Sequence, residues 1–219
     1  MMTERLEKGN CFVGYLFFKR LLDIFLSFLM LSILSPLFLL LMLLVKLTSV
    51  GPIFYVGKRL GREGKVVVVY KFRTMRVDAE RVFDRLYKAN DWIKKEWDRY
   101  QKLSKDPRCT WIGRWLRKSS LDELPQLLCV LKGDLSMVGP RPHYLSLLDS
   151  KNPFSFYADK VLSVKPGLTS FWQVVGRNHL SYAERVALDC QYVEKQSFFV
   201  DCSLLLKTIP TLFCASRTS

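Results

Sequence analysis

The strongest constraint on the fold is an uncharged run of 22 residues, 24–45, in a chain of 219 residues. A straight helix of that length rises about 33 Å, which is enough to cross the hydrocarbon core of a bilayer. The run is too long for a typical signal peptide and lies too far from a small-residue cleavage site. We therefore expect residues 24–45 to form a membrane helix.

The middle of this run holds Ser35 and Pro36. Proline removes a helical hydrogen bond and kinks the chain, which leaves two arms of about 16 Å each, roughly half a bilayer. Both flanks are basic, and the positive-inside rule would hold both in the cytoplasm. A re-entrant helical hairpin satisfies both observations, and a single kinked span is the alternative. The basic residues are Arg5, Lys8, Lys19 and Arg20 before the run, and Lys46, Lys58, Arg59, Arg62 and Lys65 after it.

Charge and cysteine content narrow the class of protein. Lys and Arg number 34 against 20 Asp and Glu, a formal net charge of +14. This excess predicts an anionic partner: nucleic acid, a phospholipid surface or a phosphorylated substrate. The six cysteines form no CxxC pair and no Cys/His cluster. We therefore expect reduced thiols rather than a disulfide framework or a zinc site.

The next segments indicate a mixed fold. Residues 52–55 and 66–70 are rich in β-formers and flank a Gly-Arg-Glu-Gly turn, so they predict a short β-hairpin. Gly61, Gly64 and Lys65 fail the spacing of a nucleotide P-loop. Residues 78–103 carry an apolar stripe and predict one helix with a solvated charged face.

Residues 110–118 predict an amphipathic helix. Trp111, Ile112, Trp115 and Leu116 share one face, and the basic residues lie elsewhere. Aromatic residues opposite cations are typical of a helix in the headgroup layer of a membrane. A core helix with tryptophan anchors is the alternative.

The adjacent acids Asp122 and Glu123 allow two interpretations. In the first, Ser120 and Glu123 form a capping box, in which Glu123 accepts from the Ser120 amide, and Asp122 favours the positive end of a helix that stops at Gly133. In the second, the helix start attracts phosphate and lowers the pKa of Asp122, so that one acid attacks while the other binds a metal. Arg141, held between two prolines on a stiff loop, suits two-point binding of a phosphate and favours the second interpretation.

At these residues the chain resembles the bacterial sugar transferases, the monotopic phosphoglycosyl transferases. The matching pieces cover the chain from about residue 17 to its end in family order. They are KRLLD at 19–23, Ser35-Pro36, GPIFY at 51–55, YKFRTM at 70–75, the long stretch 106–142, KPGLTSFWQVVGR at 165–177 and LDCQYVEKQSFFVD at 188–201.

The resemblance implies a fold and a reaction. Such enzymes move a sugar 1-phosphate from a UDP-sugar to undecaprenyl phosphate and release UMP, at the cytoplasmic face of the bacterial inner membrane. Asp122 would be the nucleophile that forms a covalent phospho-sugar intermediate, and Glu123 would hold Mg²⁺. Ser35 and Pro36 would break a re-entrant membrane helix. Membrane phospholipids and downstream glycosyltransferases are further candidate partners, within a pathway of exopolysaccharide or lipopolysaccharide biosynthesis.

We therefore expect an α-rich α/β fold with a re-entrant N-terminal membrane helix, a small β-hairpin and interfacial amphipathic helices that carry the site. Residues 1–50 would form the basic flank and membrane helix, and residues 51–219 a catalytic domain. Because the two anionic reactants must be neutralised, cations should surround the acids. Arg141 is the main candidate for binding phosphate; Lys71, Arg73, Arg117, Arg177 and Asp189 are further candidates, each with a structural role as the alternative.

Three positions depart from the family pattern: Gly57 where Gln is expected, Ser170 where Gly is expected and Val175 where Asn is expected. They leave the choice of sugar open. A glycosyltransferase with a DxD metal site is disfavoured because no two Asp residues are two apart. A protein that only binds anionic lipids or nucleic acid would explain the charge but not the acids beside the phosphate loop, so no nucleic-acid partner is expected.

Overall fold

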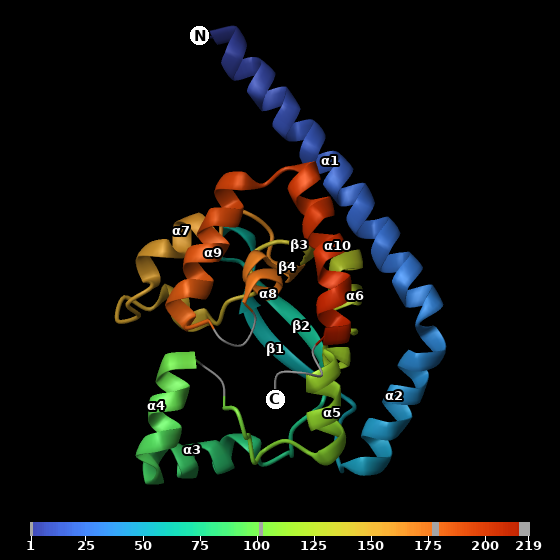
Figure 1. Cartoon of the computed structure of the whole chain (residues 1–219), viewed down its shortest axis with the longest axis vertical. Helices are drawn as coiled ribbons and strands as arrows, with labels where there is room; N and C mark the ends of the chain where they lie inside the picture. Colours follow the sequence, from blue (N-terminus) through green and yellow to red (C-terminus); the bar gives the residue numbers. More distant parts are fainter. Residues whose placement is uncertain (1, 101–102, 177–179, 215–219) are drawn as a thin grey trace.

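The computed structural model describes residues 2–100, 103–176 and 180–214 and shows a helix-rich α/β protein (Figure 1). The helices are α1 (Met2–Ile33), α2 (Ser35–Thr48), α3 (Ala79–Ala89), α4 (Asp91–Tyr100), α5 (Trp111–Ser119), α6 (Gln126–Lys132), α7 (Ala158–Val161), α8 (Phe171–Val175), α9 (Tyr182–Lys195) and α10 (Phe198–Cys214). The strands are β1 (Phe54–Leu60), β2 (Val66–Phe72), β3 (Ser136–Val138) and β4 (Gly167–Thr169), and short 3-10 turns are η1 (Arg62–Gly64), η2 (Leu121–Glu123), η3 (Leu145–Leu148) and η4 (Ser155–Tyr157).

The predicted break at Ser35 and Pro36 is confirmed. Helices α1 and α2 meet at Leu34 with a bend of 66°, and Pro36 lies in the first turn of α2, where its missing N–H leaves no gap in the hydrogen bonding. The Ser35 hydroxyl donates to the carbonyl of Ser32 at 2.9 Å. Within the described part of the chain no single helix is both long and apolar enough to cross a bilayer, and only this bent pair reaches that length together. Its entry into a membrane remains a prediction.

The α1–α2 arm runs along one side of the molecule and is bound to it by buried charges (Figure 1). Asp23 is 4% exposed and accepts from the Met137 amide at 2.8 Å and the Ser136 hydroxyl at 3.1 Å. Lys19 donates to the buried carboxylate of Asp201 on α10 at 2.6 Å. Arg20 donates to two carbonyls in the last turn of α6. Lys19 and Arg20, which the sequence suggests as topology signals, are therefore bound to the rest of the fold.

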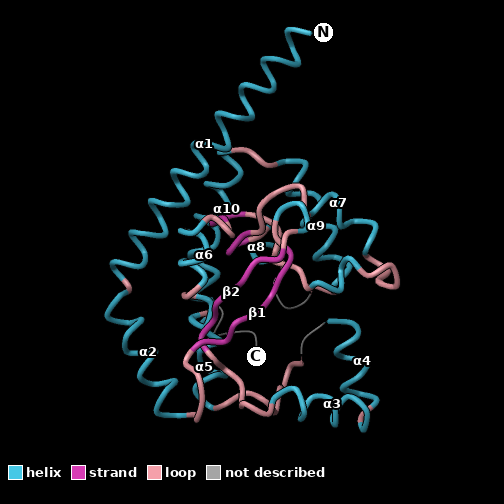
Figure 2. The backbone as a smooth tube through the Cα atoms, turned by 180° about the vertical axis from the view of Figure 1, so that it is seen from behind, coloured by secondary structure: helices cyan, strands magenta, loops and turns pink. Residues whose placement is uncertain are grey.

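The predicted β-hairpin is confirmed and is longer than expected. Strands β1 and β2 pair antiparallel from Phe54 opposite Phe72 to Leu60 opposite Val66, with η1 as the connection. The first strand begins two residues later than predicted and continues through residues 57–60, where pairing with the valines of β2 overrides weak strand propensity. Both views place the hairpin between the arm and the side formed by α7 and α9 (Figure 2).

The predicted single helix over residues 78–103 is wrong. The chain breaks at Asn90, whose backbone is extended (φ −138°, ψ 103°), and α4 folds back beside α3. Phe83 packs on Trp97 with ring centroids 4.5 Å apart, and the Arg108 guanidinium lies 4.5 Å above the Phe83 ring. The apolar side chains of this segment therefore pack α3 against α4, as Phe83 and Trp97 show, and not one long helix against a larger core.

Of the four side chains on the predicted apolar face of α5, two are buried and two are exposed. Ile112 and Leu116 are buried against Leu41 and Val45 of α2 and Phe72 of β2, in one of the cores. Trp111 and Trp115 are 62% and 48% exposed, so they do not anchor a core. α10 is similarly divided, with Leu204 buried and Leu206 and Ile209 exposed. Contact of these exposed side chains with a membrane remains a prediction.

A close backbone approach at Gly113 joins α5 to the end of the hairpin. A Cβ at Gly113 would lie 1.9 Å from the Thr74 carbonyl oxygen, whereas a Cβ at Gly14 on α1 would meet nothing within 4 Å. We expect Gly113→Ala to destabilise the fold by about 2 kcal/mol, because rigid backbone must move. Thermal unfolding in detergent should show a melting temperature lower by about 6 °C.

Gly14→Ala is the matched control. Both glycines are helical, and alanine is preferred over glycine in a helix by about 1 kcal/mol. We expect this variant to melt at or above the temperature of the parent protein. Equal melting of Gly113→Ala and the parent would contradict the proposed close packing.

Candidate active site

The two acids lie in the turn that joins α5 to α6, not at the start of a helix. Ser120 has a left-handed backbone (φ 58°), and its amide donates to the carbonyls of Leu116 and Arg117, so it ends α5. Its side chain makes no capping hydrogen bond. The capping-box interpretation is therefore wrong, because Ser120 terminates one helix and Gln126 begins the next.

Glu123 is held by two cations from different parts of the fold. Arg141 binds it at two points, with Nη1 2.8 Å from Oε2 and Nη2 in contact with Oε1. Lys71 on β2 donates to Oε1 at 2.7 Å. Burial raises the pKa of Glu123, but Arg141 and Lys71 outweigh it and hold that pKa well below its usual range. Glu123 is thus a fixed anion that joins β2 to the loop at residues 139–143.

Asp122 has the opposite environment. It is 7% exposed, and within the described ranges no hydrogen bond to its carboxylate is found. Burial raises the pKa of Asp122 to about 6, and the neighbouring charge of Glu123 acts in the same direction, while Lys71 and Arg117 lower it. The expectation that a helix start lowers this pKa is wrong, because the turn is too short and the side chain is buried.

The remaining predicted cations are in different places. Arg117 lies near the acids, with its Nε donating to the Thr74 hydroxyl at 2.9 Å and its Nη1 3.7 Å from Asp106. Arg73 turns to the end of α2, where Nη2 donates to the carbonyl and hydroxyl of Ser49 at 2.7 and 2.6 Å. Arg73 therefore makes its side-chain hydrogen bonds with Ser49 and not with Asp122 or Glu123. Arg177 lies outside the described residues.

Asp189 lies beneath the loop that carries Arg141. It is fully buried on α9, and its Oδ2 is 3.4 Å from His143 Nε2. Burial raises the pKa of Asp189, while His143 and the Arg141 backbone lower it. This placement suits support of the loop rather than direct contact with a substrate. Sequence reasoning assigned no role to His143, and its position one residue beyond the Pro-Arg-Pro motif was the available signal.

The loop itself is fixed by backbone hydrogen bonds. The Gly139 amide donates to Thr169 at 3.0 Å, the Gly167 amide to Pro140 at 2.7 Å, and the Leu60 amide to His143 at 3.0 Å. A Cβ on Gly167 would lie 2.0 Å from the Gly139 nitrogen, so the loop packs directly on β4. Because the backbone is held by β4 and by β1, the Arg141 side chain is pre-organised toward Glu123.

The carboxyl oxygens fit a hard cation. Among the described residues no group of three His, Cys, Asp or Glu side chains could form a metal cage. Mg²⁺ needs no such cage, because it commonly uses one or two carboxylates together with substrate phosphates. Glu123 Oε1 accepts from two donors but Oε2 from only one, which leaves a lone pair on Oε2 that could bind a cation. The donor set therefore suits Mg²⁺ bound together with a diphosphate.

The three departures from the family pattern lie on different elements. Gly57 is in the middle of β1, opposite Val69. Ser170 is fully buried, and its hydroxyl donates to Gln173 at 3.0 Å. Val175 is 64% exposed at the end of α8, where it lines a cavity of about 330 Å³ with residues of α8 and α10.

The sequence is similar to those of known proteins of one family. The sequence model of the family described as bacterial sugar transferase matches residues 14–215. The exopolysaccharide production protein ExoY of Sinorhizobium fredii is 46% identical over 204 residues, which cover 92% of this chain and 87% of that protein.

Two longer relatives carry names that specify a reaction. The undecaprenyl-phosphate galactose phosphotransferase of Salmonella typhimurium is 43% identical over 95% of this chain and 43% of its own length. The UDP-glucose:undecaprenyl-phosphate glucose-1-phosphate transferase of Escherichia coli is 35% identical over 87% of this chain and 39% of its own length. The extent of these matches, together with the Asp122–Glu123 turn facing Arg141, shows that the chain belongs to the bacterial sugar transferase family.

Proposed function

We propose that this protein transfers a sugar 1-phosphate from a UDP-sugar to undecaprenyl phosphate and releases UMP, through a covalent intermediate on Asp122. The observation that carries the proposal is the contrast between the two acids. The Glu123 carboxylate is bound by Arg141 and Lys71, whereas the buried carboxylate of Asp122 has no such partner within the described ranges. The names of the relatives from Salmonella typhimurium and Escherichia coli support undecaprenyl phosphate as the acceptor, and the second name also supports a UDP-linked sugar donor.

In the first step a carboxylate oxygen of Asp122 attacks the phosphorus that carries the sugar. A carboxyl–phosphorus bond forms, the bond to the bridging oxygen breaks, and its electron pair leaves with UMP. In the second step an oxygen of undecaprenyl phosphate attacks the same phosphorus. The Asp122 carboxylate leaves, and the product is undecaprenyl diphosphate linked to the sugar. An acyl phosphate remains reactive enough for this second transfer.

The surrounding charges divide the roles. Glu123 is a weak nucleophile, because Arg141 and Lys71 bind its oxygens and hold its pKa low. Asp122, with a pKa of about 6, is ionised at neutral pH and more basic than Glu123. Arg141, Lys71 and Arg117 would neutralise the diphosphate as the nucleophile approaches. Mg²⁺, held by Glu123 and the diphosphate, would supply further charge neutralisation on the leaving phosphate.

The proposed location is the cytoplasmic face of the bacterial inner membrane. The bent α1–α2 pair would enter and leave one leaflet, and the exposed side chains of Trp111 and Trp115 would lie at the headgroup layer. The name of the 46% identical relative suggests exopolysaccharide production as the pathway. The names of the two longer relatives make UDP-galactose and UDP-glucose the first donors to test.

Asp122→Asn tests the nucleophile. We expect UMP release in nanodiscs with undecaprenyl phosphate and Mg²⁺ to fall at least about a thousandfold, as when other enzymes lose a nucleophile. The control is Asp84→Asn, which removes the same charge from an exposed position on α3. Without acceptor, the parent protein should gain the mass of one phospho-sugar, and Asp122→Asn should not. UMP release that persists in Asp122→Asn would show that Asp122 is not the nucleophile.

The pKa of Asp122 predicts an acid limit to the reaction. Because the attacking group must be ionised, kcat/KM should fall about tenfold per pH unit below about pH 6. Lys71 lowers this pKa, so Lys71→Gln should move the midpoint of the acid limb to higher pH, whatever its effect on the maximum rate.

The control for that pH profile is Lys88→Gln, which removes an exposed cation from α3. We expect its acid midpoint to match that of the parent protein. An unchanged midpoint in Lys71→Gln would show that Asp122 does not control the acid limb.

A further inference from the structure

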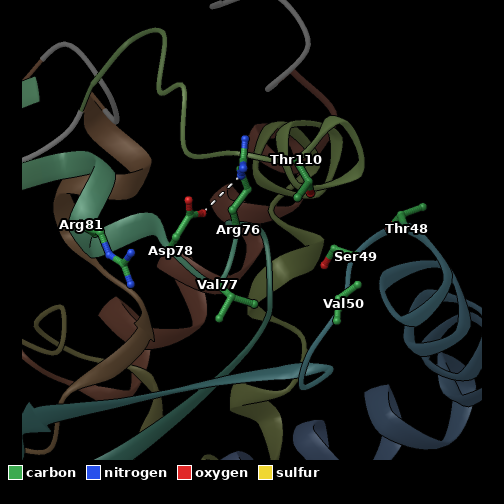
Figure 3. Close-up of a pocket in the computed structure, with 8 residues that line it drawn as sticks. All are labelled: Thr48, Ser49, Val50, Arg76, Val77, Asp78, Arg81 and Thr110. Carbon is green, nitrogen blue, oxygen red and sulfur yellow. Dashed lines mark ion pairs between the residues drawn. The ribbon is translucent and has the colours of Figure 1, made fainter. Parts of the chain in front are cut away.

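A second site lies where the chain leaves α2. A cavity of about 450 Å³ opens there (Figure 3), and neither of the two acids lines it. Thr110 lines it at the start of α5, whereas Asp122 follows the end of that helix, about 13 Å along the axis. We call it the α2-exit pocket; its lining is Thr48, Ser49, Val50, Arg76, Val77, Asp78, Arg81 and Thr110.

The lining has more positive than negative charge. Arg76 Nε is 3.3 Å from the only lining carboxylate, Asp78 (Figure 3). The Arg81 side chain is exposed and forms no ion pair with any residue that the structure describes. The lining holds two arginines and one aspartate, so its net charge is positive even without Arg73.

Arg73 adds a buried cation directly behind this wall. It is 7% exposed, and its Nε and Nη1 have no hydrogen-bond partner in the described ranges. A Cβ on Gly51 would lie 2.2 Å from Arg73 Nη1 and 3.1 Å from Val77, so the guanidinium lies against the same segment that forms the wall. Buried guanidinium N–H groups without partners are costly, and an anion nearby would compensate them.

The Ser49 hydroxyl adds a further hydrogen-bond donor for a phosphate. Ser49 Oγ accepts from Arg73 Nη2 at 2.6 Å, which leaves the Ser49 proton free to be donated toward the pocket. Guanidinium forks and hydroxyls together are typical donors to phosphate oxygens. The pocket thus suits a singly or doubly charged phosphate.

An exposed apolar surface on α2 leads to the pocket and favours a lipid as the source of the phosphate. Leu40, Leu43 and Leu47 on α2 recur at helical spacing, are 51%, 54% and 73% exposed, and are followed by Val50 at 90%. Val50 also lines the pocket. We propose that the α2-exit pocket binds the phosphate of an anionic glycerophospholipid, whose acyl chain lies along this stripe. The proposal rests on the proposed membrane location but not on the transfer reaction.

The test measures which lipids stay bound. The full-length protein is reconstituted in nanodiscs of phosphatidylglycerol and phosphatidylcholine in equal amounts, released, and analysed by native mass spectrometry. We expect preferential retention of phosphatidylglycerol. The double variant Arg76→Gln with Arg81→Gln should reduce that preference about thirtyfold, the scale expected for two arginines at an anionic surface.

Matched variants separate a local site from general charge. Arg62→Gln with Arg99→Gln removes two exposed arginines elsewhere and should keep the preference. Val50→Glu keeps both pocket arginines but places a carboxylate at an exposed position of the lining, so it should lose the preference without disturbing the fold. Equal loss in the control pair would overturn the proposal in favour of non-local membrane attraction.

Competition experiments test other sources of the phosphate. Displacement of phosphatidylglycerol by inorganic phosphate, but not by chloride at equal ionic strength, would reassign the pocket to a soluble phosphate. Displacement by undecaprenyl phosphate at equimolar amounts would reassign it to the acceptor. Asp122→Asn should keep the lipid preference although it releases no UMP, so failure of the transfer reaction and failure of the lipid site are distinguishable.

Discussion

The Glu123 carboxylate is the contact on which the candidate site depends. It joins three segments that are far apart in the chain: β2 through Lys71, the turn after α5, and the loop of Arg141. Arg141 can reach it because β4 and β1 fix the loop backbone, while Asp189 on α9 lies against the His143 side chain. The same two cations that neutralise Glu123 also lower the pKa of Asp122, and in the proposed reaction they would neutralise the incoming diphosphate. The buried Glu123 carboxylate therefore organises the site and also fixes the positions of Lys71 and Arg141.

Buried polar contacts also connect the α1–α2 arm to the rest of the fold. Asp23, Lys19 and Arg20 lie on a helix that exposes many apolar side chains between Val13 and Ile33, yet each finds a partner on β3, α6 or α10. The ion pair of Lys19 with Asp201 and the hydrogen bonds of Asp23 and Arg20 contribute little net stability but specify one geometry, since breaking one leaves a charge without its partner. The arm is thus oriented by specific polar contacts, and its exposed leucines remain available for another environment.

The sequence predicted the parts whose signals are local. The break at Ser35 and Pro36 follows from the missing amide of proline, and the hairpin follows from valine-rich strands around a glycine turn. The helix break at Asn90 was missed because neither glycine nor proline marks it, and only the contact between Phe83 and Trp97 reveals it. The direction of the Asp122 pKa was predicted wrongly, since burial depends on tertiary packing that helix-end rules do not contain. Lys71 and Arg141 were predicted as candidates, but their shared partner Glu123 and the diversion of Arg73 to Ser49 required the structure.

The bond between Lys19 and Asp201 also has a consequence for the order of folding. Its partners are 182 positions apart, and the contacts of Arg20 with α6 are 110 and 111 positions apart. Such contacts form late, because a long loop must be closed before they contribute. During synthesis the N-terminal arm must therefore wait for α10 before it reaches its final orientation. Until then its apolar surface and charged groups are unprotected, so at the proposed membrane location early insertion of the arm would guard against aggregation.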